Sequence, residues 1–404
     1  ATTEGERTFD RALRPQLVGI STDLPGPALD GVSVTATVDT RFTTSPTVLK
    51  IVAMIVAVVA TALALWTLAR LDRADGRLHR RLLPASWWSF TRIDALVAGT
   101  LLLWHVIGAN TADDGYQLGM ARAAGEAGYM ANYFRWFGVP EAPFGTPFYD
   151  VLALMTQVST ASIWMRLPAL TAGILCWWVL SREVAPRLGV ALRRNRLPLW
   201  TGALVFLAFW LPLNNGLRPE PIVATGIVLT WCSVERAIAT RRLLPAAAAI
   251  LVAALTVTAG PSGIICFAAL IAGARPIARI LHRRAQTLGW LPVPAPMLAA
   301  GLVILVPVFA DQTLAAVLEM QHVHGVGPNV PWFQEYLRYQ YLLQITVDGS
   351  LARRFAVFTL ALCLAVAIVA MLRRGGHIPG TAQGPSRRIV GITLGALVLM
   401  MFAP

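Results

Sequence analysis

The chain has 404 residues, of which 56% are hydrophobic and only 14% are charged, and its mean hydropathy is +0.60. This composition excludes an ordinary soluble globular domain and predicts a protein embedded in a lipid bilayer. The net charge of +13 does not predict nucleic-acid binding, because the basic residues stand in short clusters between long apolar runs.

Residues 1–47 differ from the rest of the chain. They contain alternating polar and apolar stretches, such as the run from Val32 to Val38, set among glycine and proline turns. Such alternation is typical of β-strands. We interpret this segment as the C-terminal part of an extracytoplasmic β-sandwich. Since it is too short for a complete sandwich, the other strands are expected upstream.

Residues 48–404 form the second predicted domain, a bundle of membrane-spanning helices. A hydrocarbon core of about 30 Å requires roughly 20 helical residues to cross it, and about ten apolar stretches are long enough, or nearly so. They are 48–69, 93–109, 163–181, 198–214, 219–237, 243–258, 262–281, 293–312, 354–372 and 388–403. The predicted fold class is therefore mainly α, a polytopic membrane protein.

The arginines between these stretches predict the topology. They cluster after the first predicted span and then in every second loop, and the positive-inside rule places these five loops in the cytoplasm. The clusters are Arg70–Arg92, Arg182–Arg196, Arg236–Arg242, Arg275–Arg284 and Arg373–Arg388. The protein is thus predicted to lie in the plasma membrane, with residues 1–47 and most acidic loops on its outer face.

One apolar segment breaks this alternation. If residues 147–158 crossed the membrane, the cluster that begins at Arg182 would lie outside. We therefore predict a re-entrant or interfacial helix near 147–158, and such a helix requires packed protein to satisfy its backbone.

The strongest candidate for chemistry is the acidic pair Asp113 and Asp114, directly after the second predicted span. A helix-compatible stretch follows, so at least one acid lies near a helix N-terminus, where free amides and the helix dipole favour the ionised form. An ionised carboxylate can act as a general base on a hydroxyl group. The alternative is that one acid only caps the helix. Further groups suited to sugar binding follow in this loop, although its aromatic rings also fit an interfacial belt.

The next two outer loops contain cationic candidates. Arg218 lies in a tight turn, and its planar guanidinium suits phosphate oxygens; alternatively, it pairs with Glu220 to cap a helix. His322 and His324 lie in the longest outer loop. Two histidines without a nearby carboxylate do not predict a metal site, so no metal ligands are predicted, and His324 is instead a candidate to bind a substrate hydroxyl or phosphate.

Several familiar signals are absent from the sequence. It has no phosphate-binding Walker loop and no dinucleotide-binding glycine pattern, and no predicted span has a charge near its centre, where an ion-coupled transporter usually needs one. These absences favour chemistry at the outer surface. An enzyme that acts on sugars there cannot use cytoplasmic nucleotide sugars, so its donor must be lipid-linked, and a polyprenyl phosphate meets that need.

Several longer motifs resemble the Emb arabinosyltransferases of mycobacteria, which are GT-C glycosyltransferases. The resemblance covers essentially the whole membrane portion, and within the family the first outer loop looks most like EmbA. The motifs are Asp113–Tyr116, Met120–Arg122, Gly128–Gly138, Pro140–Gly145, Trp164–Pro168, Ser181–Val184, Asn215–Glu220 and Thr346–Phe355.

This resemblance implies a GT-C transmembrane domain that transfers D-arabinofuranose from decaprenyl-phosphoryl arabinose to cell-wall arabinan, and it implies a target of ethambutol. It further implies that Asp113 is the general base, that Asp114 orients the loop or the acceptor, and that Arg218 binds the donor phosphate. The other pocket residues it implies are Tyr116, Met120, Glu141 and His324.

The resemblance also implies partners. We expect a heterodimer with an EmbB-like paralogue, an acyl carrier protein on the arginine-rich cytoplasmic loops, a polyprenyl-phosphate lipid and an arabinan acceptor. No cofactor is expected beyond the lipid-linked donor, and a divalent cation would bind outside this chain. Two alternatives stay open, namely a scaffold or acceptor-presenting subunit of a heterodimeric transferase, and a lipid-sugar flippase.

Overall fold

The computed structural model describes residues 48–74, 84–111, 113–127, 134–136, 139–140, 148–189, 196–309, 351–374, 378 and 381–399. The predicted β-sandwich segment, residues 1–47, lies outside the described residues.

The described part of the chain is almost entirely helical. In chain order its elements are α1 (Val48–Ala74), η2 (Ala85–Trp88), α2 (Arg92–Ile107), α3 (Asp114–Ala127), β1 (Phe134–Trp136), β2 (Val139–Pro140), α4 (Phe148–Thr156), α5 (Ser162–Met165), α6 (Leu167–Val179), η3 (Leu180–Val184), α7 (Ala185–Leu188), α9 (Arg196–Asn214), α10 (Glu220–Thr240), α11 (Leu243–Ala259), η4 (Pro261–Ile264), α12 (Ile265–Leu288), α13 (Pro294–Phe309), α16 (Leu351–Arg373) and α17 (Gln383–Leu399). Strands β1 and β2 pair in antiparallel fashion.

The protein is a multi-pass membrane protein. Within the described residues, five helical segments are long and apolar enough to cross a bilayer, and they are Ile51–Ala74, Ser162–Leu188, Arg196–Asn214, Glu220–Thr240 and Ser262–Leu288. Each of the other five predicted spans also coincides with a helix. Four of these helices, α2, α11, α13 and α17, have only 16 or 17 residues, and in α16 the apolar segment is Phe358–Arg373. The count of ten crossings stays a prediction.

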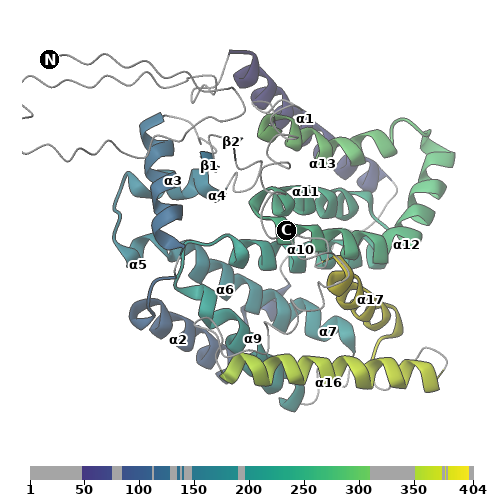
Figure 1. Ribbon diagram of the computed structural model, residues 1–404. Helices are drawn as coiled ribbons and strands as arrows, with labels where there is room; N and C mark the ends of the chain where they lie inside the picture. Colours follow the sequence, from purple (N-terminus) through teal and green to yellow (C-terminus); the bar gives the residue numbers. More distant parts are fainter. Residues whose placement is uncertain are drawn as a thin grey trace, which may run out of the picture.

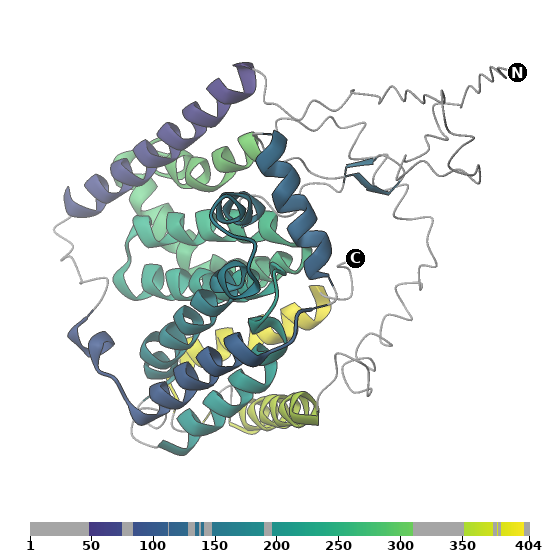
Figure 2. The ribbon, with the colours of Figure 1, turned by 90° about the vertical axis from the view of Figure 1, so that its left-hand side faces the viewer.

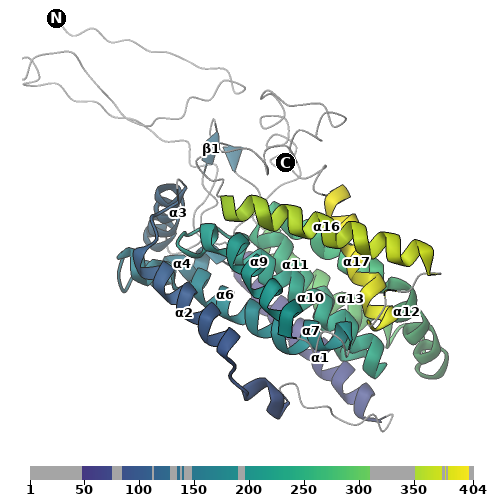
Figure 3. The same ribbon diagram turned by 90° about the horizontal axis from the view of Figure 1, so that it is seen from below.

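Helices α10 and α11 lie side by side in the middle of the bundle (Figure 1). Helices α1 and α13 pack together on one side of this pair, and α9 and α16 lie on the other, as the turned views also show (Figures 2 and 3). Large apolar side chains on the outside of α1, such as Ile55 and Val59, are more than half exposed. Exposed apolar side chains of this kind are typical of a helix that lies in a lipid bilayer.

Small residues let the central helices approach closely. A Cβ atom added at Gly226 of α10 would collide with the side chain of Thr256 in α11. Another added at Gly273 of α12 would collide with Val234 of α10. Close backbone approach through small residues is the usual packing mode of membrane helices, because lipid provides no hydrophobic drive for helices to associate.

Helix α4 occupies the segment that broke the predicted alternation of loops. It has nine residues, which is too short to cross a hydrocarbon core. It packs against α3 through a cluster that includes Phe148, Tyr149 and Leu152. Figure 1 shows α3 upright beside the ends of the horizontal helices α10 and α11. The relation of α4 to the membrane stays a prediction.

Buried ion pairs connect the helices at the end of the bundle away from α3. Asp94 of α2 accepts hydrogen bonds from both terminal nitrogens of Arg182, each at 2.6 Å, and from the Trp177 indole nitrogen at 2.8 Å. Three more buried carboxylates at this end pair with arginines from other helices, and these pairs are Glu183 with Arg236, Glu235 with Arg388, and Asp72 with Arg284. We call these four carboxylates and their arginine partners the inner ion pairs.

Candidate functional site

Asp114 connects two loops at the α3 end of the bundle. Its carboxylate is buried and accepts hydrogen bonds from the backbone nitrogen and the hydroxyl of Thr111 in its own loop. It also accepts a hydrogen bond of 2.9 Å from the backbone nitrogen of Leu217, which lies between α9 and α10. All three donors are protein groups, so this acid holds the α2–α3 loop against the α9–α10 loop.

Asp113 occupies a different environment, although it is the adjacent residue. Its backbone carbonyl accepts the hydrogen bond of Gln117 N in the first turn of α3, while its side chain is 43% exposed. One carboxylate oxygen lies 3.5 Å from Nη2 of Arg218. The capping alternative therefore applies to the backbone of Asp113, and its carboxylate is left accessible.

Arg218 joins Asp113 to a third charged group. Its Nη2 lies 2.9 Å from Oε1 of Glu220, and its side chain is 36% exposed. The Arg218–Glu220 pair considered from the sequence is therefore present, and it extends to Asp113. We call Asp113, Arg218 and Glu220 the outer triad.

A buried arginine stabilises the segment between α2 and Asp113. Arg166, at the junction of α5 and α6, donates to the carbonyl of Gly108 at 2.9 Å and to the side chain of Asn110. Asn215 donates to the carbonyl of Ala109. Together these bonds fix the segment that leads from α2 to Asp113. Sequence reasoning gave no role to Arg166, and the only signal for it was its place in the motif Trp164–Pro168.

The two loops approach too closely for a side chain at Gly216. A Cβ atom there would lie 2.6 Å from Cγ2 of Thr111 and 3.1 Å from Oδ1 of Asp114. Glycine is therefore required at this position for the α9–α10 loop to reach Asp114.

The structure brings Asp113, Asp114 and Arg218 together, but it does not place every predicted site residue beside them. Tyr116 is half-buried and packs against the apolar cluster between α3 and α4. Glu141, His324 and the side chain of Met120 lie outside the described residues. Within the described ranges, no three histidine, cysteine or acidic side chains form a group that could hold a metal ion.

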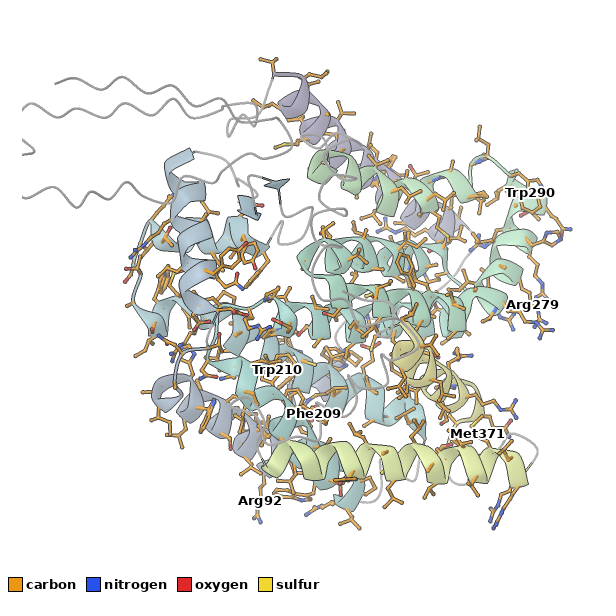
Figure 4. All side chains as sticks on the ribbon, viewed as in Figure 1. Arg92, Phe209, Trp210, Arg279, Trp290 and Met371 are labelled. Carbon is orange, nitrogen blue, oxygen red and sulfur yellow. The ribbon has the colours of Figure 1, made fainter. Side chains whose placement is uncertain are left out.

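Two cavities adjoin these residues. A small polar cavity of about 130 Å³ is lined by Asp114, Arg166, Asn110 and Ser162, among others. A larger cavity of about 660 Å³, which we call the apolar cavity, lies between α6, α9, α10 and α16. Its lining is almost wholly apolar and includes Phe209 and Trp210 of α9, both labelled in Figure 4.

The apolar cavity begins at the outer triad. Glu220 is its only acidic lining residue among those described, and Pro221 and Leu213 line it nearby. The lining then follows α9 back to Pro198, a stretch of about 22 Å at a rise of 1.5 Å per residue. A long apolar space thus ends beside an accessible carboxylate and an arginine.

Comparison with a family model gives a match over residues 45–404, and the family is described as mycobacterial cell wall arabinan synthesis protein. "Probable arabinosyltransferase C" of Mycolicibacterium smegmatis is 56% identical over 402 residues, which cover 99% of this chain and 37% of that protein. "Probable arabinosyltransferase B" of Mycobacterium tuberculosis is 54% identical over 414 residues, covering 98% of this chain and 38% of that protein. This chain thus spans little more than a third of the length of these relatives.

A solved structure is also similar. The cryo-EM structure of arabinosyltransferase EmbB from Mycobacterium smegmatis matches with a TM-score of 0.79 and 51% sequence identity, over 98% of this chain and 36% of that one. The relatives reported above are B and C members, so the particular similarity to EmbA that the first loop suggested stays a prediction.

Proposed function

Since this chain belongs to the mycobacterial cell wall arabinan synthesis family, we propose that it contributes the catalytic face of an arabinosyltransferase. The donor is decaprenyl-phosphoryl arabinose and the acceptor is cell-wall arabinan. The observation that carries the proposal is the contrast between two adjacent acids, because Asp114 is buried and fully used in the fold whereas Asp113 is exposed beside Arg218.

Asp113 is the proposed general base. A carboxylate that is 43% exposed can accept a hydrogen bond from an incoming acceptor hydroxyl, which is the geometric requirement for this role. In the reaction the hydroxyl oxygen bonds to the anomeric carbon of the donor arabinose, and its proton passes to Asp113. The bond between the anomeric carbon and the phosphate oxygen breaks, and the phosphate leaves with that electron pair.

Arg218 is the proposed partner of the donor phosphate. The leaving phosphate gains negative charge in the transition state, and a preorganised guanidinium stabilises such charge. In the structure the same guanidinium contacts both Asp113 and Glu220. A bound phosphate would draw Arg218 from Asp113, and the carboxylate would then be open to the acceptor hydroxyl.

The apolar cavity is the proposed place for the polyprenyl chain of the donor. Its volume and apolar lining suit a hydrocarbon chain, and its polar end at Glu220 adjoins Arg218. A lipid chain lying in it would present its phosphate to the outer triad. We place the triad on the extracytoplasmic side, because the arginine clusters mark the opposite ends of the spans as cytoplasmic.

Assembly with a paralogous subunit is part of this proposal. Paralogues of types B and C are among the relatives, and an acyl carrier protein on the arginine-rich loops is a further predicted partner. Co-purification of the full-length protein with a tagged paralogue and with a tagged carrier tests both pairings, and failure of either partner to co-purify would contradict that pairing.

The decisive experiment for the reaction replaces Asp113 in the full-length protein. Asp113→Asn, reconstituted in membranes with labelled decaprenyl-phosphoryl arabinose, should lower the transfer rate by at least about 100-fold. Asp113→Glu keeps a carboxylate and should retain part of the activity. Because Asp113 is exposed, neither change should lower the amount of folded protein. Unchanged transfer by Asp113→Asn would exclude it as the general base.

A further inference from the structure

A third cavity lies at the far end of α10 from the outer triad. Helix α10 has 21 residues, so about 30 Å separates its two ends. The cavity has a volume of about 340 Å³, and four of its lining residues are arginines. We call it the arginine cavity, and the four are Arg241 after α10 and Arg279, Arg283 and Arg284 on α12.

Two of the four arginines of the arginine cavity lack a carboxylate partner within the described part of the protein. The nearby acid Asp72 is fully buried and already paired with Arg284 at 3.2 Å. Glu235 on α10 is paired with Arg388. Among the described residues no carboxylate forms an ion pair with Arg279 or Arg283, both of which are exposed. Guanidinium groups gathered around one space favour an anion with several oxygens, such as a phosphate.

The surroundings of the arginine cavity indicate a membrane surface. Its other lining residues are apolar and include Ile238 and Ile280. The turn that follows α12 exposes Trp290 and Leu291, at 59% and 78%. Figure 4 shows Trp290 and Arg279 at the same edge of the molecule. An exposed tryptophan next to arginines is typical of the headgroup region of a bilayer.

The arrangement differs from an ordinary cluster of cytoplasmic arginines. Arg373 and Arg374 at the end of α16 also belong to a predicted cytoplasmic loop and are exposed, but they line none of the three cavities described above. The positive-inside rule explains charges of that kind without a binding site. It does not explain why arginines of α12 and of the turn after α10 surround one space whose other lining residues are apolar.

We infer that the arginine cavity binds the phosphate groups of an anionic phospholipid in the leaflet at this end of the bundle. The guanidinium groups would hold the phosphates, and Ile238, Ile280 and the exposed Trp290 would contact the upper part of the acyl chains. Basic pockets between membrane helices are known to suit lipids with several phosphates, such as cardiolipin. This inference does not depend on the proposed transfer reaction, because the cavity lies at the other end of the bundle from the outer triad.

The test titrates delipidated full-length protein in detergent with fluorescent cardiolipin. Arg279→Gln combined with Arg283→Gln should weaken binding by about 10- to 30-fold, at roughly 1 kcal/mol for each arginine. The matched control, Arg373→Gln combined with Arg374→Gln, removes the same charge outside the cavity and should leave binding within about 2-fold of the parent protein. Replacing Arg279 and Arg283 by lysine keeps the charge and should give an intermediate loss.

Three outcomes would overturn the inference. Equal losses in the cavity and control variants would show that only net charge attracts the lipid. Equal affinity for fluorescent phosphatidylcholine would show that the phosphates are not recognised as anions. Displacement of the fluorescent lipid by inorganic phosphate at the same concentration would show that the cavity binds free phosphate. Thermal unfolding of each variant checks that it is folded. If the glutamine variant of Arg279 and Arg283 does not fold, lipid binding by the lysine variant is compared with that of the control variant instead.

Discussion

The two ends of the helix bundle use acidic residues in opposite ways. At the inner end Asp94, Glu183, Glu235 and Asp72 are at most 6% exposed, and each is paired with an arginine. At the outer end Asp113 is 43% exposed, and its closest charged partner lies at 3.5 Å. The inner carboxylates therefore interact fully with arginines of other helices, whereas the carboxylate of Asp113 is accessible to a substrate group.

The difference has a physical cause. A buried charge without a partner is strongly destabilising, so a carboxylate inside the bundle must be matched by donors from the protein. A carboxylate at the rim keeps its hydration and needs no such partner, and an exposed ion pair contributes little to stability. Within the outer loop the same division separates Asp114 from Asp113, and the two are one residue apart.

The largest expected effect of a single substitution on stability is at the inner end. Asp94→Ala leaves the buried guanidinium of Arg182 and the indole nitrogen of Trp177 without their acceptor, so unfolding should become easier by about 3–5 kcal/mol. Thermal or denaturant unfolding in detergent measures the change. Asp113→Ala is the matched control at the outer end and should cost less than about 1 kcal/mol. Similar losses for both variants would contradict the division between the two ends.

A smaller loss is expected for Asp114, since one of its donors is a side-chain hydroxyl that can turn elsewhere. Asp114→Ala leaves the backbone nitrogen of Leu217 buried without an acceptor, and the expected loss in the free energy of unfolding is about 2–3 kcal/mol. Asp114→Asn keeps one acceptor oxygen and should lose less. The same unfolding assay measures both variants, and a stable Asp114→Ala protein would show that the two loops do not depend on this acid.

Much of the bundle could be predicted from the sequence. An apolar run of about 20 residues is a local and strong signal, so each predicted span coincides with a helix, and the ends agree to within several residues. The general position of Asp113 and Arg218 could also be predicted. Both residues followed predicted spans on the same face, so their loops were expected to lie at one end of the bundle.

The inner ion pairs and the cavities could not be predicted in this way. From the sequence, the arginines after each span serve only as topology signals. The choice of partner, such as Arg388 for Glu235, depends on how α17 packs against α12 and α7. Arg166 is missed for a similar reason, because two of its acceptors are backbone carbonyls 58 and 61 residues away along the chain and the third is the side chain of Asn110, 56 residues away. Backbone acceptors leave no pattern in the sequence, and a cavity exists only after several helices are placed.

The close approach of the two outer loops predicts a further loss at Gly216. In Gly216→Ala the added methyl group would overlap Thr111 and press on Asp114, and overpacking of this kind costs about 1–3 kcal/mol. Gly99→Ala is the control, because nothing lies within 4 Å of a Cβ atom there, and it should be neutral or slightly stabilising, as alanine favours helices. If Gly216→Ala and Gly99→Ala have the same free energy of unfolding, the two outer loops are not in contact.

The smallest expected effect concerns the apolar cavity, which extends from the outer end of the bundle toward the inner end. Gly202 of α9 lines it, and a Cβ atom there would meet nothing within 4 Å. Gly202→Leu should therefore leave the fold intact and occupy space proposed for the polyprenyl chain, raising the KM for decaprenyl-phosphoryl arabinose by about 10-fold, which corresponds to about 1.4 kcal/mol. Gly99→Leu, on the exposed side of α2, should leave the KM unchanged. If Gly202→Leu also leaves the KM unchanged, the donor chain lies elsewhere, and Asp113 and Arg218 must be reached by a donor that does not pass along α9.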